Sequence, residues 1–145
     1  MKRLVLAALV GGLGGPFPVA LVAQPAQGPY LAELVEVVDG DTLTLRVHIW
    51  LGQQVTTSVR LEGIDTPELH GACPEERVRA AAARDALARH AASGPLVVSD
   101  VRFDKYGGRV RARVADGEGV DLAARLLAEG HARPYGGGAR GIWCG

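Results

Sequence analysis

The chain has 145 residues, which suits one domain better than two. Its 16 basic and 16 acidic residues cancel, and without Lys2 and Arg3 the net charge is −2 (14 minus 16). This balance excludes nucleic-acid binding by bulk positive charge, so any such binding must come from a local basic cluster.

The N-terminal segment differs from the rest of the chain. Lys2 and Arg3 precede residues 4–23, which carry no charge. A charged start, an apolar stretch and small residues at its end are typical of a secretory signal peptide, which we expect over residues 1–23. The alternative is an uncleaved inner-membrane anchor, since about 20 apolar residues span a bilayer. The sequence therefore predicts a secreted or periplasmic bacterial protein, or an anchored one that faces outward.

Three strands are expected after a linker at residues 24–30. Residues 31–38 form the first, and Asp39-Gly40 is a two-residue hairpin signal. Apolar and polar residues then alternate over 43–49 and again over 55–61, with a turn at 52–54. Alternation with a period of two predicts half-buried strands, so these three runs form a meander.

A helix, two strands and a second helix follow. Residues 74–92 begin with proline and are rich in alanine, which favours a helix. Strands are expected over 96–103 and 109–115, joined by a loop at 105–108, and a short helix over 122–129. Five strands with a helix between the third and fourth are typical of an OB-fold barrel. We therefore expect a mixed α+β, mainly β domain over residues 31–135.

The chain contains two cysteines, Cys73 and Cys144. In an exported protein an even number of cysteines indicates a disulfide, and the alternative is two free thiols. Their spacing excludes a CxxC redox motif, and no Cys or His lies at a spacing suited to zinc. A bridge would tether the glycine-rich tail, residues 136–145, to the start of the first helix.

Acidic and basic residues gather at the expected strand ends. Asp41 follows the first hairpin turn, Arg60 lies at the end of the third strand, and Asp65 and Glu68 follow that strand. Arg109 opens the fifth strand. Two carboxylates with a backbone carbonyl form an oxygen-only site that suits calcium. A third acid could orient or deprotonate water, and two guanidinium groups could stabilise charge on a phosphoryl group. Together these groups indicate metal-assisted phosphodiester hydrolysis.

Each of these segments also has a simpler interpretation. Asp39-Gly40-Asp41 is by itself a turn, and residues 65–68 suit the cap and first turn of a short helix. Arg109, Arg111 and Arg113 alternate with apolar residues, as on a solvated sheet face. Only the combination of these acids and arginines in one chain indicates a functional site.

Three segments occur in a specific order. They are Val-Val-Asp-Gly-Asp-Thr over residues 37–42, Val-Arg-Leu-Glu-Gly-Ile-Asp-Thr-Pro-Glu over 59–68, and Asp-Lys-Tyr-Gly-Gly-Arg over 104–109. This series resembles the staphylococcal nuclease (thermonuclease) family, over about residues 31–135. The resemblance implies an OB-fold nuclease that requires Ca²⁺, acts on DNA and RNA and leaves 3′-phosphate ends.

The resemblance also implies roles for individual residues. Asp41, Asp65 and the carbonyl of Thr66 match the calcium ligands, and Glu68 matches the residue that positions or deprotonates the attacking water. Arg60 matches the first phosphate-binding arginine.

The loop before the fifth strand departs from the family pattern. That pattern, Asp-x-Tyr-Gly-Arg, has one glycine, whereas Gly108 is an extra residue here. Arg109 matches the second arginine if the loop is one residue longer; otherwise that arginine is missing. Tyr106 and Tyr135 are candidate substrate contacts, and for Tyr135 packing against the core or tail is the alternative.

Two other function classes remain. An OB barrel can bind single-stranded nucleic acid without cutting it, and an exported domain can bind another protein or the cell envelope. The three acids and Arg60 favour the enzyme. The expected partner is a DNA or RNA substrate, with no obligate protein partner, and a monomer is the default.

Overall fold

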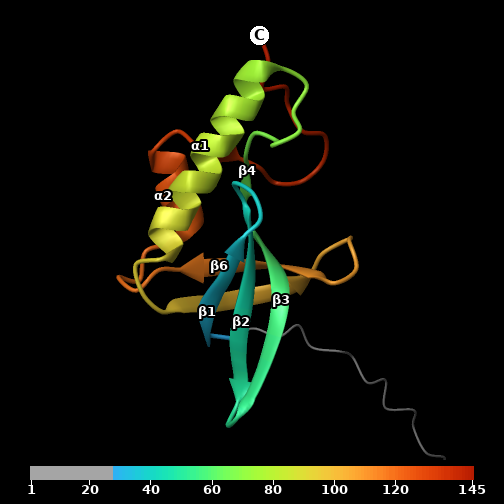
Figure 1. Cartoon of the computed structure of the whole chain (residues 1–145). Coiled ribbons are helices and arrows are strands. Elements are labelled where there is room, and N and C mark those ends of the chain that lie inside the picture. Colours follow the sequence, from blue (N-terminus) through green and yellow to red (C-terminus); the bar gives the residue numbers. More distant parts are fainter. Residues whose placement is uncertain (1–27) are drawn as a thin grey trace, which may run out of the picture.

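The structure is a computed structural model that describes residues 28–145 (Figure 1). The predicted signal peptide, residues 1–23, lies outside the described residues. Five strands form a closed barrel in which neighbours follow the order β1-β2-β3-β6-β5. The barrel strands are β1 (Tyr30–Val37), β2 (Thr42–Trp50), β3 (Gln53–Leu61), β5 (Leu96–Phe103) and β6 (Arg109–Ala115).

This strand order confirms the predicted mainly β fold with an OB-like barrel. β3 runs parallel to β6, the other neighbouring pairs are antiparallel, and β1 pairs with β5 to close the barrel. Helix α1 (Pro74–Ala91) precedes the fourth barrel strand, and α2 (Leu122–Ala128) follows the fifth. Each predicted strand and helix ends within two residues of its observed bounds.

Breaks in register bend the barrel strands β1, β2 and β5. In β5 the break lies between Ser99 and Arg102. Asp100, within it, has a φ of +53°, a conformation that aspartate tolerates better than most residues. An extra residue in one strand increases the local twist, which a small closed barrel requires.

The core fills the barrel and continues beneath the helices, which lie together over one end of it (Figure 1). Helix α1 buries one apolar stripe, formed by Ala80, Ala83, Leu87 and Ala91. Because alanine is small, the α1 backbone can lie close to the residues beneath it. Within residues 28–145, neither helix has the length and apolar character needed to cross a membrane. The buried leucines come from the barrel and both helices: Leu43, Leu45, Leu61, Leu87, Leu96, Leu122 and Leu126.

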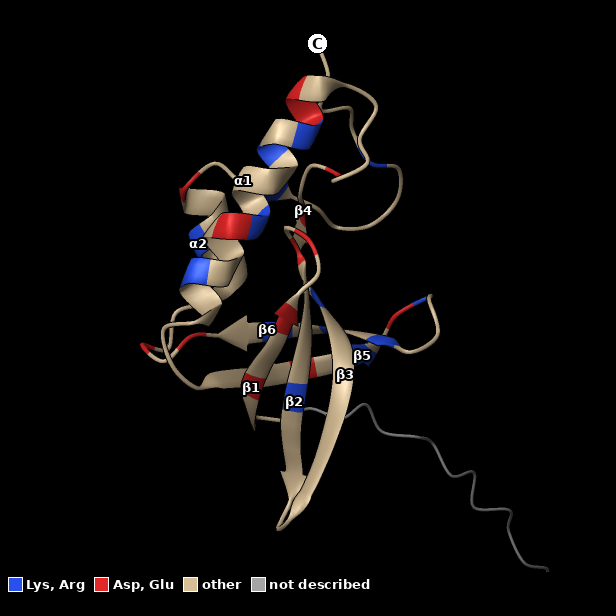
Figure 2. Ribbon diagram, viewed as in Figure 1, with Lys and Arg blue, Asp and Glu red and all other residues tan. Residues whose placement is uncertain are grey.

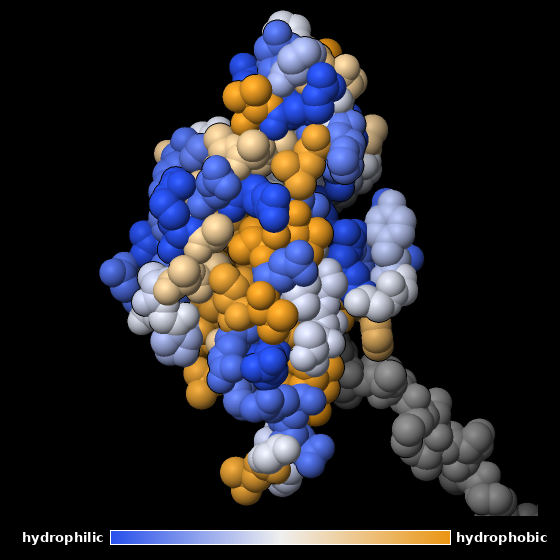
Figure 3. Space-filling model, viewed as in Figure 1, coloured by the Kyte–Doolittle hydropathy of each residue, from blue (hydrophilic) through white to orange (hydrophobic). Residues whose placement is uncertain are grey.

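The far end of the barrel is the tip of the β2–β3 hairpin. Trp50 and Leu51 at this tip are 75% and 90% exposed, so they add little to the core (Figure 3). The paired acidic and basic residues Asp41, Arg60 and Asp65 lie at the other end, where the strands meet the helices and the tail.

A second, two-stranded sheet joins that end of the barrel to the C-terminal tail. Its strands are β4 (Ile64–Asp65) and β7 (Arg133–Pro134), with Asp65 opposite Arg133. The short helix considered for residues 65–68 is absent, since the chain leaves β4 without helical turns. The pairing of β4 with β7 places the tail beside Asp65.

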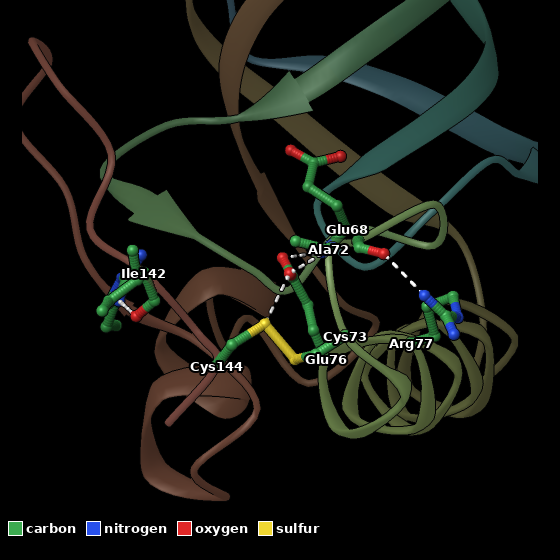
Figure 4. Close-up of a disulfide and its surroundings, with 9 residues drawn as sticks. Glu68, Ala72, Cys73, Glu76, Arg77, Ile142 and Cys144 are labelled. Carbon is green, nitrogen blue, oxygen red and sulfur yellow. Dashed lines mark hydrogen bonds between the residues drawn. A yellow bond between two sulfur atoms is a disulfide. The ribbon is translucent and has the colours of Figure 1, made fainter.

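The predicted disulfide between Cys73 and Cys144 is formed, with a Cα–Cα distance of 6.0 Å. It joins the residue before α1 to the end of the tail (Figure 4). The buried carboxylate of Glu76 lies beside it, with Oε2 3.6 Å from Cys144 Sγ. Glu76 accepts the backbone N–H groups of Glu68 and Ala72 at 3.2 and 3.0 Å. The disulfide and Glu76 thus hold the tail and the loop that carries Glu68 in one unit.

Removing the disulfide should destabilise the domain markedly. The bond joins cysteines 71 positions apart, and opening a loop of this length restores chain entropy worth about 4 kcal/mol to the unfolded state. We expect the Cys73→Ser/Cys144→Ser variant to melt on the order of 10–20 °C below the wild type. Thermal unfolding followed by circular dichroism measures this difference. A change of only a few degrees would contradict a loop-closure contribution of this size.

A buried aspartate organises the turn between β6 and α2. Asp116 accepts the backbone N–H groups of Glu118 and Val120 at 2.9 and 3.0 Å, and Nε of Arg125 at 2.5 Å. Burial by itself raises the pKa of Asp116, but these hydrogen bonds outweigh it, and the net pKa is lowered. The ionised carboxylate therefore stabilises the folded state.

Asp116→Asn should lower the free energy of unfolding at pH 7 by about 2 kcal/mol, because a buried acceptor for several donors is lost. Since the folded pKa lies below the ordinary value of 3.8, the wild type holds this stability above that pH. It loses the stability as the pH falls through the folded pKa, so the two proteins should converge in acid. Urea unfolding at neutral and acidic pH tests this. Glu118→Gln is the control, since its side chain is 77% exposed.

Candidate functional site

Asp41 and Arg60 form an ion pair between β2 and β3. The pairing of Thr42 with Arg60 and a 2.8 Å hydrogen bond from Leu61 N to Asp41 O set this register. Nη2 of Arg60 lies 3.0 Å from Asp41 Oδ2 and donates to the carbonyl of Ile64 at 3.3 Å. Both side chains are less than a tenth exposed. The two residues thus meet at a fixed, largely dry position where β3 leads into β4.

Asp41 carries a negative charge that its surroundings compensate only in part. Burial raises the pKa of Asp41 to about 6, although Arg60 opposes the rise. The carboxylate of Asp39 nearby adds to the rise, and the hydroxyl of Thr42 donates to Asp41 Oδ1 at 2.8 Å. A further cation at this carboxylate would therefore be favourable.

The backbone beside Asp41 packs closely against Thr66. A Cβ atom placed on Gly40 would lie 2.8 Å from Oγ1 of Thr66 and 2.9 Å from Cβ of Ala83 in α1. No larger residue than glycine fits here without a shift of its neighbours. The predicted hairpin glycine therefore also brings the segment that carries Asp65 and Thr66 against the Asp41 turn.

Asp65 is buried among arginines from the tail. Its Oδ2 accepts Nη2 and Nε of Arg133 at 2.8 and 3.0 Å. Within residues 28–145 its Oδ1 has no hydrogen-bond partner, and Nε of Arg140 lies 3.5 Å from it. The side chain is 1% exposed. A buried carboxylate oxygen without a hydrogen bond is costly unless it binds something else.

Glu68 is the exposed acid of the group. Its side chain is 52% exposed, and Oε1 pairs with Nη1 of Arg140. Figure 4 shows the carboxylate pointing away from the disulfide, while the backbone N–H of Glu68 donates to Glu76. The backbone is therefore anchored, and the carboxylate can meet solvent.

Basic side chains line a cleft of about 350 Å³ next to these acids. Figure 2 shows basic and acidic segments interspersed along the β5–β6 loop and where β3 leads into β4. The positive side chains of the cleft come from four separate parts of the chain, and two tyrosines, four glycines and the acids Glu62 and Asp104 complete the wall. The cationic and aromatic lining consists of Arg60, Lys105, Tyr106, Arg109, Arg111, Tyr135 and Arg140.

The extra glycine in the β5–β6 loop leaves Arg109 in this cleft. Gly108 has a φ of +78°, which a glycine adopts without strain, so the loop accommodates the additional residue. Nε of Arg109 pairs with Asp104 Oδ2 at 2.5 Å, and its guanidinium lies 4.9 Å from the centre of the Tyr106 ring. Arg109 and Arg111 are partly buried, so the solvated face considered for them applies only to Arg113.

Tyr135 packs against the tail and also borders the cleft. Its hydroxyl donates to the carbonyl of Gly138 at 2.6 Å, and the guanidinium of Arg60 lies 5.8 Å from the centre of its ring. The structure thus brings Arg60, Arg109, Tyr106 and Tyr135 to one cleft. Asp41, Asp65 and Glu68 are linked to that cleft through Arg60 and Arg140.

Sequence reasoning missed the two tail arginines, Arg133 and Arg140. A signal for Arg140 existed, because it lies four residues before Cys144, and a bridge to Cys73 returns the tail to the neighbourhood of Glu68. Among residues 28–145, one group of three His, Cys, Asp or Glu residues has its ligand atoms within 4.8 Å: Cys73, Glu76 and Cys144. Both sulfurs of that group are in the disulfide, so it offers no thiolate to a metal.

No protein-family model matches the chain, and no curated protein shows significant similarity to it. The interpretation of the site therefore depends on its geometry and on the motifs in the sequence.

Proposed function

We propose that the protein is a calcium-dependent nuclease that hydrolyses phosphodiester bonds of DNA, RNA or both. The observation that carries the proposal is the buried Oδ1 of Asp65, which has no hydrogen bond and lies beside an arginine-lined cleft. An oxygen of this kind suits a hard cation, and a cleft of this kind suits a phosphodiester.

The donor set fits calcium better than a softer metal. Asp41, Asp65 and the carbonyl of Thr66 would supply oxygen ligands, and no thiolate or imidazole contributes. The raised pKa of Asp41 agrees with a carboxylate in need of a further positive partner. When bound, calcium would polarise the phosphate and neutralise charge that develops in the transition state.

The protein's own side chains would bind the phosphate, orient the attacking water and contact the bases. Arg60 would hold a nonbridging phosphate oxygen from its position between Asp41 and the cleft, and Arg109, which also lines the cleft, would hold another. Glu68, the only one of the three acids with an exposed carboxylate, would orient the attacking water or take its proton. Tyr106 and Tyr135 offer ring faces to which a base could stack.

The disulfide supports an oxidising compartment for this activity. Disulfides persist outside the reducing cytosol, so we propose that the protein acts after export or on the outer face of a membrane. The substrate would then be extracellular or periplasmic nucleic acid.

A second candidate is an OB-fold module that binds nucleic acid without cutting it. The observation in its favour is that arginines cover both Asp65 and Glu68, which would leave neither acid free for chemistry. This candidate predicts binding without calcium and no cleavage.

Cleavage of single-stranded DNA by the purified protein distinguishes the two candidates. We expect cutting in millimolar calcium, and we expect chelator to reduce it to background because the ligand acids then lack their cation. RNA of the same sequence, assayed in parallel, shows the substrate preference. Chelator-resistant binding with no cleavage by a folded, disulfide-bonded protein would instead favour the binding module.

A further inference from the structure

The C-terminal tail brings one arginine to both acids of the candidate site. Arg140 pairs with Glu68 and lies 3.5 Å from the Asp65 oxygen that has no hydrogen bond. It also lines the cleft that contains Arg60 and Arg109. Arg140 is therefore within reach of the acids and of any phosphate in the cleft.

The two tail arginines are held very differently. Arg133 donates to Asp65 and to the carbonyls of Gly141 and Ile142, and its guanidinium stacks 4.1 Å from the centre of the Trp143 ring. Its partners surround it, and its side chain is 31% exposed. Among residues 28–145, Arg140 pairs with the two acids only, and its side chain is 42% exposed.

The segment that carries Arg140 is fixed at its ends and adaptable between them. Pairing of β7 with β4 holds one end, and the disulfide at Cys144 holds the other. Gly137 and Gly138 between them have φ values of +102° and +87°, and a Cβ on either would meet no neighbour within 4 Å. The tether keeps Arg140 near the site, and the glycines let its position change.

We infer that Arg140 is a third substrate-binding arginine. When a cation binds Asp65, the Arg140 guanidinium leaves Asp65 and Glu68 and pairs with a substrate phosphate. The inference rests on the proposed function and extends it. A divalent cation at Asp65 Oδ1 competes with the guanidinium beside that oxygen, because like charges at such distances repel. The displaced guanidinium faces the cleft, where a phosphate offers it a charge-assisted pair.

Arg140→Gln therefore has opposite effects on the two ligands. Calcium binds the variant more tightly than the wild type, because the competing cation is gone. A nucleotide phosphate binds the calcium-saturated variant more weakly, because its partner is gone. A purely structural role for Arg140 would weaken both.

Calorimetric titration of the full chain measures both effects. Calcium is titrated without nucleotide, and thymidine 5′-monophosphate is titrated at saturating calcium. We expect the calcium Kd of Arg140→Gln to fall roughly tenfold and the nucleotide Kd to rise roughly tenfold. Arg84→Gln, which removes the same charge from an exposed position on α1, should change neither.

A second variant tests the tether. Cys73→Ser/Cys144→Ser keeps Arg140 but frees the end of the tail, so both Kd values should shift in the same directions as in Arg140→Gln, by smaller factors. Equal Kd values in this variant and the wild type would contradict a role for the disulfide in placing Arg140.

The outcomes separate this inference from the proposed function. Calcium binding and DNA cleavage by the wild type, with unchanged Kd values in Arg140→Gln, overturn the role of Arg140 and leave the nuclease intact. Tighter calcium binding with an unchanged nucleotide Kd overturns phosphate binding by Arg140. Absence of calcium binding in both proteins overturns the inference together with the calcium site.

Discussion

Glu68→Gln should lower the rate of DNA cleavage about a thousandfold while the protein remains folded. The amide has nearly the shape of the carboxylate but cannot take a proton from water, and it orients water less strongly than a charged group. The side chain is 52% exposed, so its replacement should cost the fold little. The expected loss is in kcat, measured under saturating calcium and DNA, with circular dichroism to confirm the fold.

Glu75→Gln is the matched control for this variant. Glu75 is an exposed acid in the first turn of α1. Its replacement removes the same charge from the surface and should leave cleavage within about twofold of the wild type, as expected for an exposed position away from the chemistry. Near-normal cleavage by Glu68→Gln would remove Glu68 from the mechanism.

Arg60→Lys should lower kcat by roughly 10²–10³-fold even though it keeps the positive charge. The guanidinium reaches Asp41, the carbonyl of Ile64 and the cleft at the same time, and an ammonium group cannot span these partners. A lysine still compensates the charge of Asp41, so most of the stability should survive. Steady-state kinetics together with thermal unfolding separates the loss of activity from loss of the fold.

Arg113→Lys is the corresponding control on β6. Its side chain is 60% exposed and pairs with Asp121 outside the cleft, so the exchange should leave both kcat and the melting temperature nearly unchanged. If Arg60→Lys cut DNA within a few-fold of the wild-type rate, a point charge would suffice at this position, and catalysis would not need the guanidinium of Arg60.

Local signals in the sequence predicted the fold closely. Period-two alternation marked β2 and β3, Asp39-Gly40 marked the turn before β2, and Pro74 marked the start of α1. The signals succeeded because side-chain alternation, hairpin geometry and helix propensity act over a few neighbouring residues. The pair β4–β7 escaped prediction because two-residue strands have no periodicity to detect, and their pairing joins residues nearly 70 positions apart.

The candidate site was predictable only in part. Asp41, Arg60, Asp65 and Glu68 occur in compact motifs, so residue type and spacing were enough to single them out. Arg133 and Arg140 occur in a tail without motifs. Their ion pairs with Asp65 and Glu68 depend on the β4–β7 pairing and on the disulfide. No local pattern in the tail encodes these ion pairs.

The sequence by itself determined the strands, the helices, the acids and the first arginines, because short-range propensity and spacing carry that information. It also restricted the two cysteines to a single pairing. Only the tertiary structure decided that Gly108 leaves Arg109 in the cleft, that Asp65 keeps an oxygen without a hydrogen bond, and that the tail covers the acids with Arg140. Burial, ion pairing and cleft shape arise when distant segments pack together, and closure of the barrel and the disulfide bring those segments into contact.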